Sequence, residues 1–213
     1  MTTPATATRR SASTPLATAA IASFTLWALA LLLLHALRPD RALATTWISG
    51  YALGQYGWLM TMGWLAASCG CVMLVFGLAK SGPQTGAGRL GIPLLGILAL
   101  GMLITAIFPP DKPGQPSISG EIHSISFLVN VTCVLLASVL LSIGFGSDPR
   151  WRTFQRTAAI LAALLVAAFM LQFVTAYFEV LYGLANRFFA LVLIVWLLLI
   201  SIRLRAVERG ATD

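Results

Sequence analysis

Residues 16–37, LATAAIASFTLWALALLLLHAL, decide the fold class because they contain no Asp, Glu, Lys or Arg. A helix needs about 20 mainly apolar residues to cross the hydrocarbon core of a bilayer. Five more blocks of similar length and character follow, at about 58–79, 89–108, 123–145, 154–177 and 182–202. The sequence therefore predicts an all-α integral membrane bundle of six transmembrane helices, with the membrane domain at 16–205.

The composition supports a membrane protein and argues against a nucleic-acid partner. Hydrophobic residues make up 58% of the chain and charged residues only 10%, whereas soluble domains carry about 25% charged residues. The net charge of +7 comes from basic residues that lie mainly in the short segments between apolar blocks. No basic run is dense enough for a nucleic-acid surface. We therefore expect membrane lipids, and no nucleic acid, as partners.

The distribution of Lys and Arg predicts the orientation of the helices. Ten basic residues fall on one side: Arg9, Arg10, Lys80, Arg89, Arg150, Arg152, Arg156, Arg203, Arg205 and Arg209. Four fall on the other: Arg38, Arg41, Lys112 and Arg187. Because basic residues concentrate on the cytoplasmic side, we expect both termini in the cytoplasm and the protein in the plasma (inner) membrane. Residues 1–15 are then a disordered cytoplasmic tail, and 206–213 form a second cytoplasmic tail.

Two further patterns concern packing and the first outer loop. Gly63, Gly70 and Gly77 recur at intervals of seven, which predicts a smooth stripe where another helix packs closely. The loop segment TTWISGYALGQYGW, residues 45–58, is rich in aromatic residues and glycine. Aromatic residues favour the bilayer interface, so we expect a short helix there, lying on the outer surface or dipping into it.

Polar side chains within the predicted helices concentrate toward their outer ends. Because polar groups are costly in hydrocarbon, they should turn inward and satisfy one another. We expect Arg187 to pair with Glu179, Asp111 or Glu121. A purely structural role, in which these polar residues only hold the helix ends together, would give the same pattern. The sequence thus predicts a polar pocket in the outer half of the bundle, formed by Asp111, Glu121, His123, Asn130, Gln172, Thr175, Glu179, Asn186 and Arg187.

His123 has two interpretations, as a neutral member of this network or as a catalytic base. In the catalytic interpretation Asp111 orients His123, which activates Ser49 or another nearby serine. No recognisable nucleophile motif surrounds these residues. A catalytic zinc usually needs three protein ligands, and the chain has only two histidines, His35 and His123, so carboxylates would have to complete the set. The two histidines could also clamp a haem. We expect neither a metal nor a cofactor.

Several short motifs resemble one family of membrane proteins. They are IFPPD at 107–111, Gly120-x-x-His123 with Phe127, Gly183-Leu184-x-x-Arg187 ahead of Trp196, and ISGYALGQYGWLM at 48–60. Together they are similar to the "domain of unknown function 998" family of bacterial and archaeal polytopic membrane proteins. The resemblance implies that Ser49, Asp111, His123 and Arg187 occupy the family's pattern positions on the outer side. Gly50 stands where an acidic residue is expected, and the family implies no activity.

Three functions are compatible with these patterns. The first is binding of a lipid headgroup or small amphiphile at the outer leaflet, or service as a membrane partner subunit, with oligomer formation possible in either case. The second is an intramembrane hydrolase acting from the outer face with His123, Asp111 and Ser49. The third is a small transporter, although no paired broken helices or inner polar path is visible. Whether the protein is an enzyme stays open at this point.

Overall fold

The computed structural model describes residues 14–210, which form six long α-helices and one short 3-10 helix. Each of the six is long and apolar enough to cross a membrane, so the predicted all-α bundle of six membrane-spanning helices is confirmed. The tails predicted at 1–15 and 206–213 lie partly outside the described residues. The elements are α1 (Thr14–Leu37), η1 (Ile48–Ala52), α2 (Gly57–Ser81), α3 (Gly86–Ile107), α4 (Ile118–Ser147), α5 (Arg152–Tyr177) and α6 (Tyr182–Glu208).

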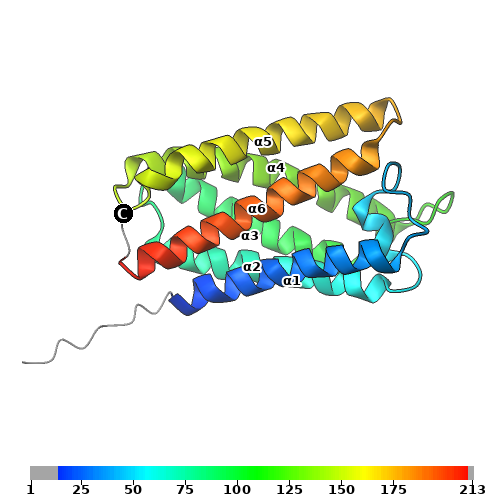
Figure 1. Ribbon diagram of the computed structural model, residues 1–213, viewed down its shortest axis with the longest axis horizontal. Helices are drawn as coiled ribbons and strands as arrows, with labels where there is room; N and C mark the ends of the chain where they lie inside the picture. Colours follow the sequence, from blue (N-terminus) through cyan, green and yellow to red (C-terminus); the bar gives the residue numbers. More distant parts are fainter. Residues whose placement is uncertain (1–13, 211–213) are drawn as a thin grey trace, which may run out of the picture.

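The helices form a ring in which each packs against the next in the chain (Figure 1). Helix α6 closes the ring against α1 and also touches α2. Segments 38–56, 108–117 and 178–181 gather at one end, here called the long-loop end (Figure 1). The start of α1 and the end of α6 lie at the opposite end, here called the termini end.

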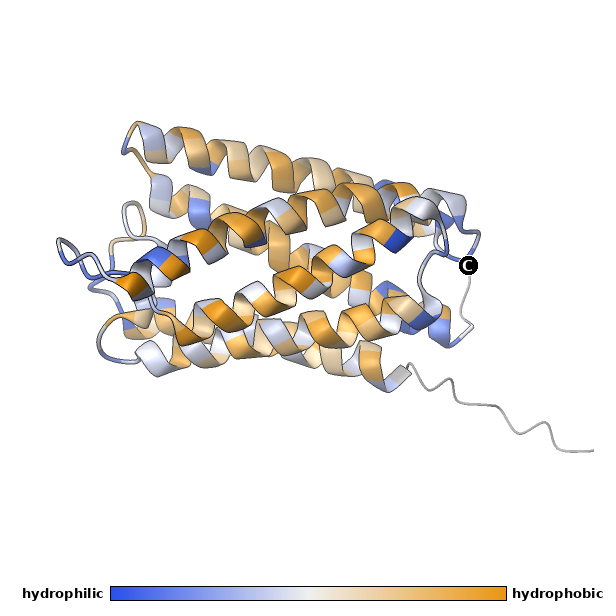
Figure 2. Ribbon diagram, turned by 180° about the vertical axis from the view of Figure 1, so that it is seen from behind, coloured by the Kyte–Doolittle hydropathy of each residue, from blue (hydrophilic) through white to orange (hydrophobic). Residues whose placement is uncertain are grey.

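Hydrophobic residues cover the outside of the ring as well as its interior. Figure 2 shows apolar colouring along the middle of all helices and polar colouring at both ends. Leucines such as Leu26 and Leu32 and the aromatic Phe173 are exposed by more than half. Soluble monomers rarely expose apolar surface on this scale. The chain is therefore an integral membrane protein whose outer surface contacts lipid.

Glycines in α2 allow two other helices to approach closely. An added Cβ at Gly70 would lie 2.7 Å from the ring of Phe24 in α1, and one at Gly63 would lie 3.2 Å from Trp27. Gly77 instead faces Leu204 of α6. The predicted glycine stripe is thus a packing surface, used by α1 along most of its length and by α6 at the termini end.

Helix α4 begins earlier than hydropathy alone suggests. Its N-cap is Ser117, whose Oγ accepts a hydrogen bond from the Gly120 backbone N–H at 3.1 Å. The first helical residue is Ile118, five residues before the apolar block predicted at 123–145. Capping by a serine side chain satisfies a backbone donor that would otherwise be unpaired. This brings His123 into the second turn of a well-capped helix.

The connection between α4 and α5 closes the termini end. Trp151 is fully buried, stacks on Phe145 at 4.6 Å between ring centroids and donates from Nε1 to the Ser81 carbonyl. Asp148 and Arg150 form an ion pair at 2.8 Å. The hydrogen bond from the Arg150 guanidinium holds the pKa of Asp148 below its ordinary value.

Candidate functional site

A cavity of about 460 Å³ occupies the long-loop half of the ring. Helices α1, α2, α3, α4 and α6 and the first loop all supply lining side chains, whereas α5 supplies none. Its volume falls within the range of small-molecule sites, about 300–1,000 Å³. The walls are mostly aromatic rings, thioethers and aliphatic groups, including Trp27, Trp47, Trp64, Met60, Met102, Phe127, Leu128, Phe189 and Leu193.

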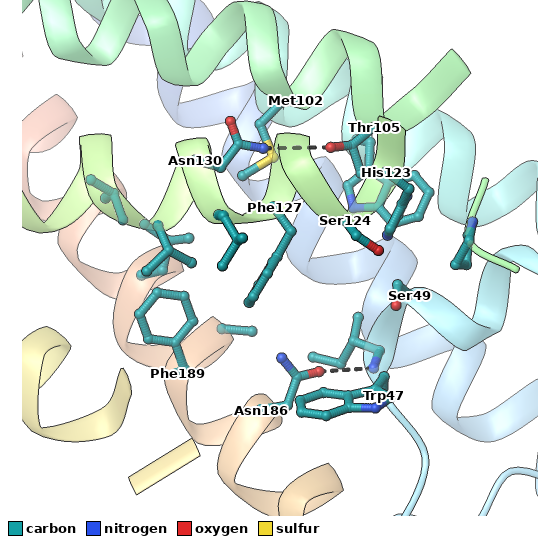
Figure 3. Close-up of a pocket in the computed structure, with 18 of the residues that line it drawn as sticks. Trp47, Ser49, Met102, Thr105, His123, Ser124, Phe127, Asn130, Asn186 and Phe189 are labelled. Atoms are coloured by element: carbon teal, nitrogen blue, oxygen red, sulfur yellow. Dashed lines mark hydrogen bonds between the residues drawn. The ribbon is translucent and has the colours of Figure 1, made fainter. Parts of the chain in front are cut away.

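The polar groups of the cavity are few and uncharged. None of the lining residues is Asp, Glu, Lys or Arg. Figure 3 shows Ser49, Ser124 and His123 gathered at one end of the cavity, while Asn186 approaches from α6. An apolar pocket with a few convergent polar groups is the usual form of a small-molecule site. The polar lining consists of Ser49, Thr105, His123, Ser124, Asn130 and Asn186.

His123 is oriented by a backbone carbonyl. Its Nδ1 lies 2.9 Å from the carbonyl oxygen of Phe108, and its ring packs against Trp64 at 5.5 Å between centroids. A carbonyl oxygen only accepts hydrogen bonds, so Nδ1 carries the hydrogen and Nε2 of the neutral ring keeps a lone pair. No hydrogen bond joins His123 to a serine or a carboxylate within residues 14–210.

Asp111 is placed at the start of α4 and does not orient His123. Its Oδ1 accepts a hydrogen bond from Ser117 Oγ at 2.6 Å, and Ser117 in turn caps the helix. A carboxylate at a helix N-terminus is stabilised by the helix dipole. Ser119 donates to the Pro109 carbonyl at 2.9 Å. Asp111, Ser117 and Ser119 therefore fasten the 108–117 loop to α4, and of this loop Pro110 reaches the cavity.

Asn130 joins the cavity to the contact between α3 and α4. Its Nδ2 lies 3.4 Å from Thr105 Oγ1, and the hydroxyls of Thr105 and Ser126 each donate to the Gly101 carbonyl at 2.9 Å. The buried Oδ1 of Asn130 and Nε1 of Trp27 have no hydrogen-bond partner among the described residues. Unsatisfied buried polar atoms are uncommon in folded proteins. Both side chains line the cavity.

Asn186 connects α6 with α5 and with the first loop. Its Oδ1 accepts from the Ile48 backbone N–H at 2.8 Å, and its Nδ2 donates to Gln172 Oε1 at 3.2 Å. Thr175 bonds back to carbonyls of its own helix. Glu121 and Glu179 are exposed. Of the residues predicted to share a pocket or active site, the structure brings Ser49, His123, Asn130 and Asn186 to one cavity.

Arg187 binds neutral acceptors, so the expectation of a carboxylate partner is wrong. Its Nε donates to His35 Nε2 at 2.8 Å, and its Nη2 donates to the Tyr51 hydroxyl at 3.0 Å. Three backbone carbonyls accept from Nη1 at 2.7–3.0 Å: Leu43, Thr46 and Gly183. These oxygens and His35 satisfy the donors without an opposite charge. Arg187 thus fastens the first loop to α6.

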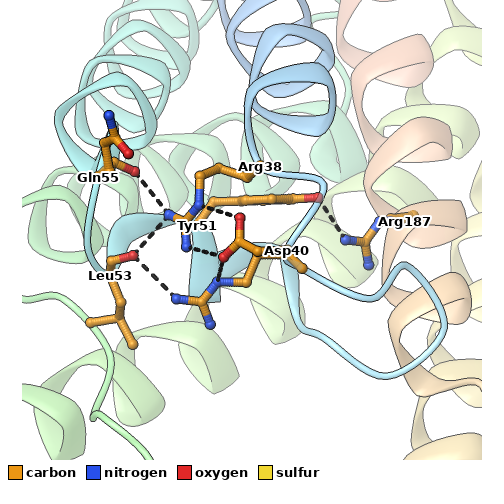
Figure 4. Close-up of polar contacts among 7 residues, drawn as sticks. Arg38, Asp40, Tyr51, Leu53, Gln55 and Arg187 are labelled. Atoms are coloured by element: carbon orange, nitrogen blue, oxygen red, sulfur yellow. Dashed lines mark hydrogen bonds and ion pairs between the residues drawn. The ribbon is translucent and has the colours of Figure 1, made fainter.

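A second arginine fixes the other side of this loop, residues 38–56, here called the roof. Arg38 forms a two-pronged ion pair with Asp40, with both contacts at 2.8 Å, and donates to the carbonyls of Leu53 and Gln55 (Figure 4). The hydrogen bond from Arg38 lowers the pKa of Asp40 below its ordinary value. The predicted short helix is η1, and it turns Ile48 and Tyr51 inward as buried residues.

Fold and site together define a class: a six-helix integral membrane protein with a mainly apolar cavity in the half of the bundle that carries the long loops. The chain belongs to the family described as "Protein of unknown function (DUF998)", whose sequence profile matches residues 5–203. The predicted family resemblance is therefore confirmed. No curated protein and no solved structure matches the chain.

Sequence reasoning missed the apolar lining of the cavity. Residues such as Trp27, Met60, Met102 and Phe189 lie in blocks that are apolar on every face. In such blocks the hydropathy pattern does not distinguish a side chain that faces a cavity from one that faces lipid. Only the polar residues could be recognised from the sequence, and most of the cavity wall is apolar.

Proposed function

We propose that the protein binds a single-chain amphiphile with an uncharged polar head in this cavity. The observation that carries the proposal is the combination of aromatic and thioether walls, a small polar end and no charged lining side chain. An ionised head would need an opposite charge or water to offset its desolvation. Hydroxyl, amide and imidazole groups instead suit an ester, amide or alcohol head.

The dimensions support a single acyl or isoprenoid chain. Along α4, the cavity runs from His123 near the polar end to Val134 at the apolar end. Eleven residues of α-helix span about 16 Å at 1.5 Å per residue. This length is close to half of the hydrocarbon core, which is about 30 Å thick. The head would lie near Ser49, Ser124 and His123, and the chain would extend past Phe127 toward Val134.

We further propose that the long-loop end faces outward, with both termini in the cytoplasm and the protein in the plasma (inner) membrane. The support is the asymmetry of basic residues, of which eight among the described residues lie toward the termini end and four toward the long-loop end. In this orientation the cavity lies in the outer leaflet half of the bilayer. The polar head of a bound amphiphile would then lie at headgroup depth.

A cavity-filling substitution tests the binding proposal. In Ala190→Trp the indole would occupy the cavity, because Ala190 lines it. Leu191→Trp is the matched control, because Leu191 is 58% exposed on the lipid face of the same helix. After delipidation, each protein is equilibrated with monooleoylglycerol, and retained amphiphile is counted by mass spectrometry.

We expect about one retained molecule per chain for wild type and Leu191→Trp, and a small fraction of that for Ala190→Trp. Oleate has the same acyl chain but a charged head, so it should be retained less than monooleoylglycerol. Equal retention by Ala190→Trp and Leu191→Trp would show that the amphiphile is not bound in the cavity.

Hydrolysis of the bound amphiphile is a second candidate, favoured by one observation. Ser49 and His123 line the same end of the cavity, and Phe108 fixes the His123 tautomer that leaves Nε2 free to accept a proton. In such a reaction Nε2 would take the Ser49 hydroxyl proton while Oγ attacks the ester or amide carbonyl. The bond from the carbonyl carbon to the alcohol or amine would then break, that group would leave with the proton from Nε2, and water would release the acyl group from Ser49. A fluorophosphonate probe should then label wild type but neither Ser49→Ala nor His123→Gln. Labelling that survives Ser49→Ala would exclude Ser49 as nucleophile.

Transport is not favoured by the termini half of the ring. The buried serines there, Ser138, Ser142 and Ser201, donate to carbonyls of their own helices. Each of these bonds uses the single O–H donor of the hydroxyl, which is then not offered to a passing polar substrate. A transporter needs polar groups along its whole path.

A further inference from the structure

We propose that the amphiphile reaches the cavity sideways from the bilayer, through an opening beside Ser124 and Leu128 of α4. This inference rests on the proposed binding function and specifies its ligand pool. It predicts that the ligand is dissolved in the outer leaflet and is not taken from water. Three observations carry it: the anchoring of the roof, the exposure of cavity-lining residues on α4, and the position of α5.

The roof is fastened at several points and is not built as a hinged lid. On the α6 side, the Ile48 N–H bonds to Asn186 and the Gly183 N–H bonds to the Ala44 carbonyl at 2.8 Å. Arg187 adds hydrogen bonds to two roof carbonyls and to Tyr51, which is fully buried. On the α2 side, Arg38 holds the carbonyls of Leu53 and Gln55. Opening the roof would break these bonds together.

The side wall, by contrast, is open beside α4. Leu128 lines the cavity and is nevertheless 60% exposed, and Ser124 likewise lines the cavity and is exposed. Helix α5 stands between α4 and α6 in the ring but contributes no lining residue. Figure 1 shows α5 diverging from α4 toward the long-loop end. At this level α5 packs on α6, where Gln172 bonds to Asn186 and Phe169 contacts Phe189, so the gap in the wall lies between α4 and the α5–α6 pair.

The depth of this opening places it among acyl chains. Leu128 follows Ile118, the first residue of α4, by ten residues, which corresponds to about 15 Å along the helix axis. Helix α4 has 30 residues, about 45 Å, and the hydrocarbon core is about 30 Å thick. With α4 centred in the core, Leu128 lies about 8 Å inside its boundary at the long-loop end, and Ser124 lies closer to the headgroups. A lipid tail can pass here without crossing water, while the polar head moves past Ser124 toward His123.

Substitutions at Leu128 test the route separately from the binding. Leu128→Trp narrows the opening and Leu128→Ala widens it. Leu136→Trp is the matched control, because Leu136 is 51% exposed two turns further along α4 and does not line the cavity. Each protein is reconstituted in phosphatidylcholine vesicles, a diazirine-bearing monoacylglycerol is added, and covalent adduct is measured after flashes at increasing times.

We expect Leu128→Trp to slow adduct formation by about tenfold, a change within the range that association rates show among variants of one site. Leu128→Ala should load at least as fast as wild type, and Leu136→Trp should match wild type. If neither Leu128 variant changes the rate while wild type forms adduct in the cavity, the lateral route is wrong and binding stands. If wild type forms no adduct in the cavity, the proposed function itself fails.

Discussion

Asn186 joins α6, α5 and the roof through one side chain, so its replacement tests how the long-loop end is held together. We consider Asn186→Leu, which keeps a similar volume but removes both the acceptor for the Ile48 N–H and the donor to Gln172. Gln172→Met is the partner substitution, because it removes only the second bond. The double variant strands only the Ile48 N–H.

The magnitude follows from the number of buried polar groups left without a partner. A stranded group costs about 1–3 kcal/mol in soluble proteins, while interhelical hydrogen bonds in a membrane average nearer 0.6 kcal/mol. Asn186→Leu strands two groups, the Ile48 N–H and the Gln172 amide, so we expect a loss of about 2 kcal/mol. Gln172→Met strands only Asn186 Nδ2, at about 1 kcal/mol. The double variant should recover to about 1 kcal/mol.

The assay is unfolding in mixed micelles of rising sodium dodecyl sulfate content, followed by tryptophan fluorescence. The diagnostic result is the ordering, in which the double variant is more stable than Asn186→Leu alone. Additive losses in the double variant would refute the reasoning, because they would mean that the two side chains do not share a bond. A loss for Gln172→Met as large as that for Asn186→Leu would refute the role of Ile48.

Three other substitutions give separate checks on stability. Gly70→Leu should lower the free energy of unfolding by about 1–3 kcal/mol, as overpacking does, because any Cβ there meets Phe24, whereas Gly96→Leu, with nothing within 4 Å, should not. Ser117→Ala should lower the free energy of unfolding by about 1 kcal/mol, because the α4 cap is lost. Ser117→Thr keeps a capping hydroxyl and should retain most of that stability. Asp148→Asn should destabilise the protein near neutral pH, with the difference from wild type closing in thermal unfolding as pH falls below 3.8. The sign follows because the pKa of Asp148 is lower in the folded than in the unfolded protein. The ionised carboxylate therefore stabilises the fold at pH values above its unfolded pKa, and this stabilisation is lost when Asp148 is protonated.

The helices were predictable because length and hydropathy are local properties of the chain. Each predicted block overlaps one helix of the structure. The start of α4 differed because the cap is made by Ser117, a polar residue that hydropathy assigns to the loop. The end of α6 extends to Glu208 because a helix continues past the apolar core into its charged flank.

The site was predictable only in part. Depth and helical spacing grouped polar residues toward one end of the bundle, and three of them, His123, Asn130 and Asn186, line the cavity. Three partners of Arg187 are backbone carbonyls, those of Leu43 and Thr46 in the roof and of Gly183 in α6. They could not be predicted, because a backbone carbonyl leaves no mark in side-chain chemistry. Leu128 and Leu136 are the same residue type in the same apolar helix, but only Leu128 lines the cavity, a difference that depends on tertiary packing.

Photo-crosslinking at equilibrium tests the central claim most directly. A diazirine-bearing monoacylglycerol is incorporated in proteoliposomes, crosslinked by a single flash and mapped by peptide mass spectrometry. The account predicts adducts concentrated on cavity-lining residues such as Met60, Met102 and Phe189, and abolished by Ala190→Trp. Adducts spread evenly over lipid-facing residues such as Leu26, Leu32 and Phe173, and unchanged in Ala190→Trp, would contradict it.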